Sequence, residues 1–247
     1  MAIELTRVDE FVVLTLNRPE ALNALSFSLI GDLGRALDEA AASGGRALLM
    51  TGAGTKAFCA GADVNELKGR SLTEQKRGVE VGQATFAKLE RLPMPSVAII
   101  NGFAFGGGLE LALATDFRIA DETAVLGFPE IGLGILPSSG GTSRAARLLG
   151  PAQAKRLILL GERVGAREAL AAGLVTEVVA EGGALARALE LARALAELPA
   201  AAVAVAKQAI DAAADSPHAA AILIERLAYG LLAQTTAARE AAEDFGS

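Results

Sequence analysis

The sequence predicts an α/β fold that carries an all-helical region at its carboxyl end. The chain has 247 residues, which suits one domain with or without an appendage. An apolar fraction of 52% is enough to fill a core. Short apolar runs alternate with segments of helical periodicity as far as Val179, whereas no strand pattern remains after Gly182.

The first two elements are predicted to form a β-hairpin. The runs Ile3–Val8 and Phe11–Leu16 alternate in polarity, and Asp9-Glu10 between them suits a tight turn. Asn17-Arg18-Pro19 then ends the second strand, because proline cannot donate to a sheet ladder.

A helix is expected to begin after Ser26, whose side chain can cap it, and to end at Gly44-Gly45. Further strands are expected at residues 47–50, 97–100, 117–120, 125–127 and 174–179. Further helices are expected at residues 74–92, 109–114, 142–149, 152–160 and 167–172. This order of strands and helices is the basis of the α/β prediction.

The tail is predicted to form three helices, with Pro199 and Pro217 as its main interruptions. We therefore divide the chain into a core of residues 1–198, which carries the candidate site, and a helical region of residues 199–247. In that region a leucine stripe of Leu223, Leu227 and Leu231 can pack within the chain or against another subunit, and the sequence favours neither.

Composition excludes several kinds of site. The single cysteine, Cys59, allows no internal disulfide and no multi-thiolate zinc site. The single histidine, His218, is expected to be structural. A net charge of −6 and the absence of tryptophan argue against a nucleic-acid partner. We therefore expect no cysteine-rich or histidine-rich metal site, and acid–base groups that are carboxylates.

No apolar run reaches the roughly 20 residues of a membrane helix. The first ten residues mix Glu4, Arg7 and Asp9 into the apolar pattern, unlike a signal peptide. We therefore expect a cytoplasmic protein with no membrane partner.

Two glycine-containing segments are weak candidates for ligand binding through backbone groups. Gly52-Ala53-Gly54-Thr55-Lys56-Ala57 fits a dinucleotide fingerprint, but no helix start follows it, so an ordinary turn is preferred. The turn Ala60-Gly61-Ala62-Asp63 allows a ligand close to the backbone, although on these residues alone a purely structural turn is preferred.

A stronger signal is Gly106-Gly107-Gly108 followed by Glu110. Three glycines opening a helix offer free N–H groups that can stabilise an oxyanion. Glu110 either points inward as a functional group or faces water and complements the helix dipole.

Glu130, in an apolar segment, is either a buried functional carboxylate or part of a loop tip. If the two carboxylates converge, they can hold one water molecule and exchange protons with a carbonyl substrate.

Taken together, the motifs resemble the enoyl-CoA hydratase (crotonase) family. The resemblance runs from about Phe11 to Val179 and on through the helical tail. Its carriers are Asn17-Arg18-Pro19, Ala21-Leu22-Asn23-Ala24-Leu25, Ala57-Phe58-Cys59-Ala60-Gly61-Ala62-Asp63, Asn101-Gly102, Gly106-Gly107-Gly108-Leu109-Glu110-Leu111, Pro129-Glu130 and Gly140-Gly141-Thr142. Several spaced motifs in one order are far more specific than any one of them.

The resemblance implies a crotonase-like spiral of ββα repeats whose C-terminal helices assemble homotrimers, often paired as hexamers. It implies an acyl-CoA thioester as substrate, as in fatty acid metabolism. It implies no metal or redox cofactor, since CoA is part of the substrate.

The resemblance also assigns roles to residues. The backbone N–H groups of Ala60 and Gly107 would form the oxyanion hole. Glu110 would deprotonate the water that attacks the β-carbon, and Glu130 would exchange the proton at the α-carbon. The residues expected to line the substrate and its CoA are Ala21, Leu22, Ala60, Gly61, Ala62, Asp63, Gly107 and Ser138.

One departure concerns Ser138, where the family usually has glycine. Serine still supplies the N–H expected to touch the reactive water, but its hydroxymethyl group narrows the pocket or binds a polar substrate group. Ser143 likewise stands where glutamine is common, and we expect it to affect packing alone. The aromatic residues Phe86, Phe105 and Phe128 line an acyl pocket or belong to the core.

The presence of both glutamates favours hydration of a trans-2-enoyl-CoA over double-bond isomerisation, decarboxylation or dehalogenation. A glycosidase also uses paired carboxylates, but the lack of tryptophan argues against a sugar cleft. A non-catalytic binding homologue is the remaining alternative.

Overall fold

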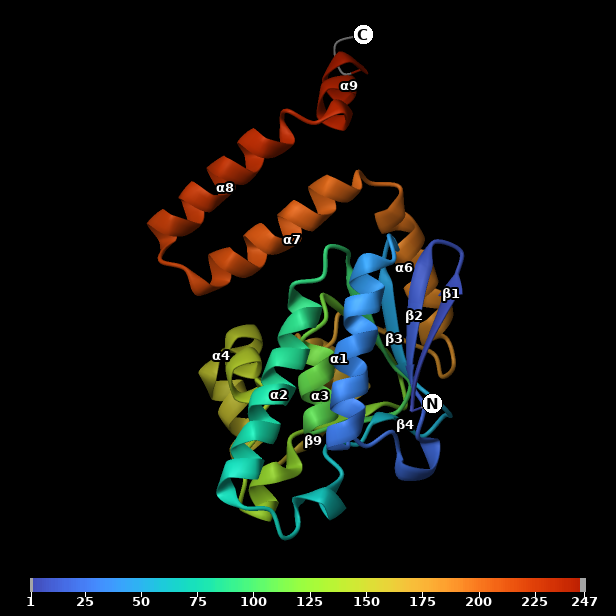
Figure 1. Ribbon diagram of the computed structural model, residues 1–247, viewed down its shortest axis with the longest axis vertical. Helices are drawn as coiled ribbons and strands as arrows, with labels where there is room; N and C mark the ends of the chain where they lie inside the picture. Colours follow the sequence, from blue (N-terminus) through green and yellow to red (C-terminus); the bar gives the residue numbers. More distant parts are fainter. Residues whose placement is uncertain (1, 245–247) are drawn as a thin grey trace.

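The computed structural model describes residues 2–244. Within them, strands and helices alternate along a layered body, and a helical hairpin extends from it (Figure 1). The main sheet has the order β1-β2-β3-β5-β7-β10. Its strands are β1 (Ile3–Val8), β2 (Phe11–Leu16), β3 (Leu48–Gly52), β5 (Ser96–Ile100), β7 (Phe117–Asp121) and β10 (Glu177–Val179). All neighbours in it are parallel except β1 and β2, the predicted hairpin.

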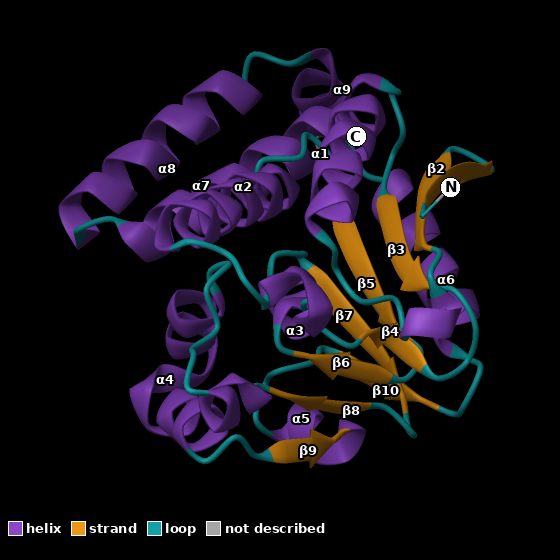
Figure 2. Cartoon of the chain, turned by 60° about the horizontal axis from the view of Figure 1, so that its bottom comes forward, coloured by secondary structure: helices purple, strands orange, loops and turns teal. Residues whose placement is uncertain are grey.

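A second sheet lies at an angle to the first and has the order β4-β6-β8-β9 (Figure 2). Its strands are β4 (Ala57–Cys59), β6 (Phe103–Phe105), β8 (Val125–Gly127) and β9 (Arg163–Gly165). The chain enters the two sheets in turn, because β3, β5 and β7 belong to the main sheet and are followed by β4, β6 and β8 in the second. A helix follows each such pair. The ββα winding predicted from the family resemblance is therefore confirmed.

Helices cover both faces of the main sheet. One face packs against α1 (Phe27–Ala42), α2 (Leu72–Glu90) and α3 (Gly107–Leu113), and the other packs against α6 (Ala184–Ala196). Alternation along β2 sends Leu14 to the first face and Val13 to the second. The predicted cap of α1 is confirmed, since Ser26 Oγ accepts the Leu29 N–H at 3.1 Å.

Three strands of the second sheet escaped prediction. β4, β6 and β9 have three residues each, a length at which a period of two identifies strands unreliably, since β8 of the same length was predicted. The predicted helices at 142–149 and 152–160 form α4 (Gly141–Leu159), which is broken at Gly150 by non-helical φ and ψ angles of 77° and 157°. Pro151 follows directly and prevents a continuous helix. The predicted helix at 167–172 is α5 (Ala166–Ala171).

The tail contains four helices within the described residues rather than the three predicted. After α6 come α7 (Ala200–Asp215), α8 (His218–Leu232) and α9 (Thr236–Asp244). The break before α9 was missed because no proline or glycine marks it; Thr235 Oγ1 accepts the Ala238 N–H instead.

The leucine stripe lies on α8, which pairs with α7 in the hairpin of Figure 1. Its members Leu223, Leu227 and Leu231 are 51%, 65% and 64% exposed. The alternative in which this stripe packs within the chain is therefore wrong. His218 is exposed at the first turn of α8.

Among residues 2–244, no helix combines the length and apolar character needed to cross a bilayer. Phe86 and Phe128 are fully buried members of the main core, which supports the core alternative for both. Phe105 is half-buried and stacks on Phe103 with ring centroids 5.3 Å apart.

Candidate active site

Glu110 is a buried carboxylate held by two backbone donors. It lies in the first turn of α3 and is 2% exposed. Its Oε1 accepts the N–H groups of Ser139 and Gly141, both at 2.7 Å. Gly141 is the first residue of α4, so the carboxylate also lies at the positive end of that helix dipole. The alternative in which Glu110 faces water is wrong.

The three glycines at the start of α3 each meet a different neighbour. A Cβ on Gly106 would lie 2.6 Å from Glu130 Oε1, and Gly106 has φ of 51° and ψ of −124°, a conformation that favours glycine. A Cβ on Gly108 would lie 2.1 Å from the carbonyl oxygen of Cys59 in β4. The glycine run thus lets α3 begin in contact with both β4 and Glu130.

Glu130 lies in a 3-10 helix, η3 (Pro129–Leu133), that follows β8. Its Oε1 faces Gly106, and its buried Oε2 has no hydrogen-bond partner among the described residues. Burial, with a smaller contribution from the charge of Glu110, raises the pKa of Glu130 to about 7 against the lowering effect of its own backbone N–H. The loop-tip alternative is therefore wrong for this carboxylate, which interacts with Glu110.

Burial also raises the pKa of Glu110. The hydrogen bonds from Gly141 and Ser139 and the charge of Arg144 act in the opposite direction. The two carboxylates therefore differ: Glu110 Oε1 accepts two N–H groups at the start of α4, whereas Glu130 interacts with its own backbone N–H and its Oε2 has no partner among residues 2–244.

The predicted oxyanion donor Ala60 does not agree with the structure, because its N–H donates to Leu22 O at 3.0 Å. The turn pairs with residues 22–25 through alternate groups, since Leu25 donates to Gly61 O and Asp63 donates to Leu25 O. This period of two leaves the Ala62 N–H without an acceptor in the described structure. The sequence could not distinguish Ala60 from Ala62 as the donor, because both are small residues. The pairing register with residues 22–25 distinguishes them, and it is known only from the structure.

Gly107 stands beside Ala62. A Cβ built on Gly107 would lie 3.7 Å from the Ala62 nitrogen and 3.8 Å from Glu110 Oε2. The Gly107 N–H precedes the hydrogen-bonded part of α3 and has no acceptor within residues 2–244. Two free N–H groups and a carboxylate oxygen therefore meet at one place.

The remaining predicted residues lie around this place. Ala21 and Leu22 are half-buried, and Leu22 borders a cavity of about 230 Å³ together with residues 53–57. Asp63 is bound by Arg18, whose Nη2 lies 3.2 Å from Asp63 Oδ2, and it caps the 3-10 helix η2 (Val64–Leu67). These contacts of Asp63 stabilise the 60–63 turn.

Ser138 is half-buried in the turn that precedes α4, and its carbonyl accepts from Gln83 Nε2 of α2 at 2.8 Å. The donors to Glu110 come from the next residues, Ser139 and Gly141. The sequence analysis missed both. The glycines at 140 and 141 were a usable signal, because a helix start with free N–H groups binds anions.

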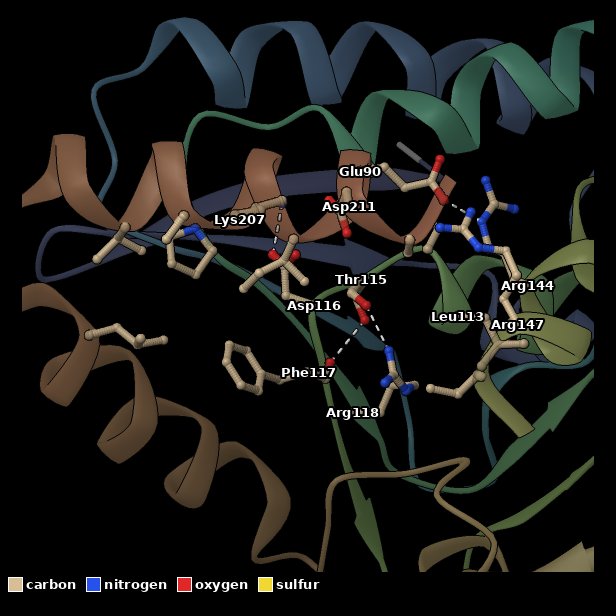
Figure 3. Close-up of a pocket in the computed structure, with 18 residues that line it drawn as sticks. Glu90, Leu113, Thr115, Asp116, Phe117, Arg118, Arg144, Arg147, Lys207 and Asp211 are labelled. Atoms are coloured by element: carbon tan, nitrogen blue, oxygen red, sulfur yellow. Dashed lines mark hydrogen bonds and ion pairs between the residues drawn. The ribbon is translucent and has the colours of Figure 1, made fainter. Parts of the chain in front are cut away.

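A larger cavity of about 620 Å³ lies at the other end of α3, between β7, α4 and α7 (Figure 3). Its polar lining includes Lys207, which binds Asp116 at 2.8 Å, and it includes neither Glu110 nor Glu130. We therefore assign the candidate active site to the two carboxylates and not to the larger cavity.

Comparison with known proteins identifies the family of this chain. A profile of the enoyl-CoA hydratase/isomerase family matches residues 7–246. The short-chain-enoyl-CoA hydratase of Clostridium acetobutylicum is 38% identical over 242 residues, covering 98% of this chain and 93% of that protein. The crotonyl-CoA hydratase of Syntrophomonas wolfei is 36% identical over 247 residues, covering 98% of this chain and 94% of that protein.

Among solved structures, the enoyl-CoA hydratase of Bacillus anthracis matches with a TM-score of 0.95 and 38% identity. The match covers 100% of this chain and 96% of that chain. A family profile across nearly the whole sequence and relatives above 30% identity lead to one conclusion: this chain belongs to the enoyl-CoA hydratase/isomerase family.

Proposed function

We propose that the protein catalyses the reversible syn hydration of a trans-2-enoyl-CoA to a 3-hydroxyacyl-CoA. The observation that carries this proposal is the pair of carboxylates, Glu110 and Glu130, placed against neighbouring glycines at the start of α3. The names of the relatives from Clostridium acetobutylicum and Syntrophomonas wolfei support the same reaction.

The environments of the two glutamates suit two roles. Glu110 has two donors on Oε1, which leaves Oε2 free to take a proton from water as its oxygen bonds to the β-carbon. Glu130, with a pKa of about 7, keeps a proton near neutral pH and gives it to the α-carbon. Water thus adds as hydroxyl and proton, and the carboxylates exchange their proton states.

The N–H groups of Gly107 and Ala62 are the donors we assign to the thioester oxygen. Negative charge grows on this oxygen when the β-carbon is attacked, and fixed backbone donors stabilise it. Ala21, Leu22 and the 60–63 turn are the proposed walls for CoA, and Ser138 the residue beside the reacting water. No metal or redox step is needed in this sequence.

The test is hydration of crotonyl-CoA by the wild-type protein, Glu110→Gln and Glu130→Gln, with the exposed Glu122→Gln as control. Each active-site variant is expected to lower kcat by about 10²–10⁴-fold, because each loses a positioned acid or base. Binding of acetyl-CoA, measured by calorimetry, is expected to change little. Normal turnover by either variant contradicts its role. A panel of 3-enoyl, malonyl and halogenated acyl-CoA thioesters separates hydration from the other reactions of the family.

We further propose that the protein is cytoplasmic and that it forms trimers or hexamers through residues 199–247. The exposed leucine stripe on α8 supports this, because 51–65% exposure of three aligned leucines is costly in water. Truncation before Pro199 is expected to dissociate the oligomer in light scattering. An unchanged mass contradicts this assignment.

A further inference from the structure

We propose that Arg144 is a positioning residue, which together with Glu90 holds the 137–141 turn whose N–H groups hold Glu110. This inference rests on the hydratase function proposed above. It concerns a side chain that contacts neither the proposed substrate path nor the reacting atoms.

The guanidinium of Arg144 joins two elements. Its Nε donates to Glu90 Oε1 at 2.7 Å, and its Nη1 donates to the Ser139 carbonyl oxygen at 2.8 Å. Figure 3 shows Glu90 at the end of α2 facing Arg144 in the first turn of α4. The Arg144 side chain is only 14% exposed, so water competes little for these bonds.

Ser139 links this ion pair to the carboxylate. Its carbonyl accepts from Arg144, and its N–H donates to Glu110 Oε1 at 2.7 Å. Glu90, Arg144, Ser139 and Glu110 therefore form one continuous series of hydrogen bonds. Displacement of the Arg144 guanidinium would free Ser139, whose N–H fixes the direction of the Glu110 carboxylate.

The backbone at residue 140 leaves space for this arrangement. A Cβ on Gly140 would lie 2.0 Å from Arg144 Nη1, and Gly140 has a φ of 107°. Both the conformation and the close approach of the guanidinium therefore favour glycine at this position. This steric relation shows how closely the guanidinium packs on the 137–141 turn.

The charge of Arg144 gives the proposal a measurable signature. It lowers the pKa of Glu110 against the effect of burial, whereas the neighbouring Glu130, with a pKa of about 7, adds negative charge only when it is ionised. On its other side Arg144 faces Glu90 of α2, and Arg147 of α4 and Asp211 of α7 border the same cavity. Loss of the Arg144 charge is expected to make Glu110 harder to ionise.

The experiment compares Arg144→Met and Arg144→Lys with Arg147→Met as the matched control. Arg147 borders the same cavity and pairs with Asp215 at 3.0 Å, away from the turn. Crotonyl-CoA hydration is measured as kcat and KM across pH. Arg144→Met is expected to lower kcat about 10- to 100-fold with little change in KM, because a small displacement of a catalytic carboxylate reduces the rate by a factor of this size. Its acidic limb of kcat/KM is expected to move to higher pH.

Arg144→Lys is expected to leave the acidic limb in place while lowering kcat, because lysine keeps the charge but lacks the planar fork that serves two acceptors. This variant decides the question if Arg144→Met fails to fold. The proposal is overturned if Arg144→Lys, or a folded Arg144→Met, matches Arg147→Met in kcat and pH profile. A wild-type protein that hydrates no enoyl-CoA contradicts the proposed function instead, which keeps the two failures distinct.

Discussion

Glu110 and Gly141, 31 residues apart in sequence, fit together so closely that position 141 has no room for a side chain. The Gly141 N–H donates to Glu110 Oε1 at 2.7 Å. A Cβ on residue 141 would lie 2.8 Å from Glu110 Cγ and 2.9 Å from Oε1. The start of α4 therefore fixes both the charge environment and the position of the carboxylate.

Gly141→Ala is expected to displace the Glu110 carboxylate and to lower kcat for crotonyl-CoA by about 10²-fold. The matched control is Gly132→Ala in η3, where a new Cβ meets nothing within 4 Å. Steady-state kinetics of both variants test this. Equal rates for the two would show that the close approach has no effect on catalysis.

Substitution at residue 107 separates a lost N–H group from an added side chain. Gly107→Pro removes the proposed oxyanion donor at the first helical position, where proline is well tolerated. Gly107→Ala keeps the N–H, and its Cβ meets Leu25 Cδ1 at 3.3 Å. We expect kcat/KM to fall about 10²–10³-fold for proline and far less for alanine. A similar loss in both would indicate crowding in place of oxyanion stabilisation.

Glu130→Gln is expected to raise the melting temperature, and more so at pH 8.5 than at pH 5.5. Burial raises the pKa of Glu130 to about 7 in the folded protein, against an ordinary value of 4.5. The folded state therefore holds this proton more tightly, and its stabilising contribution disappears as pH rises through 7. Glutamine at position 130 does not titrate, so the variant lacks this pH dependence of stability. Thermal denaturation with Glu122→Gln as control checks it, and a pH-independent difference would contradict the assignment.

Cys59 is expected to resist thiol reagents in the native protein. The side chain is fully buried in β4, and burial raises the pKa of its thiol to about 12. Little thiolate forms at neutral pH, and reagents have no access. Ellman's reagent should label one thiol per chain only after denaturation. Rapid labelling of the folded protein would mean that β4 opens readily.

Much of the fold followed from local signals. The hairpin, the helix after Ser26 and the helix start at the glycine run each have a sequence signature within a few residues. The strands β4 and β6 have none, because three residues form a strand only when a neighbouring strand supplies the ladder. Their existence is a tertiary effect.

For the candidate site, too, only residues with a local sequence signature could be predicted. Glu110 and Glu130 were recognisable because charge in an apolar setting demands a reason. The donor Ala62 and the partners of Glu110 were not, since backbone N–H groups have no side-chain signature. Which of residues 60 and 62 points inward depends on pairing with residues 22–25, a register that only the folded chain fixes.

The glycine run at the start of α3 also limits how this enzyme can be redesigned. Position 106 borders one carboxylate, 107 carries a backbone donor, and 108 touches the neighbouring strand. Positions 106 and 108 therefore leave no room for a side chain, and a library that varies these two is expected to yield mostly inactive or unfolded clones. Engineering of acyl-chain preference has more freedom in the segment after Glu130, where Ile131, Leu133 and Ile135 are 40–64% exposed and free of such constraints.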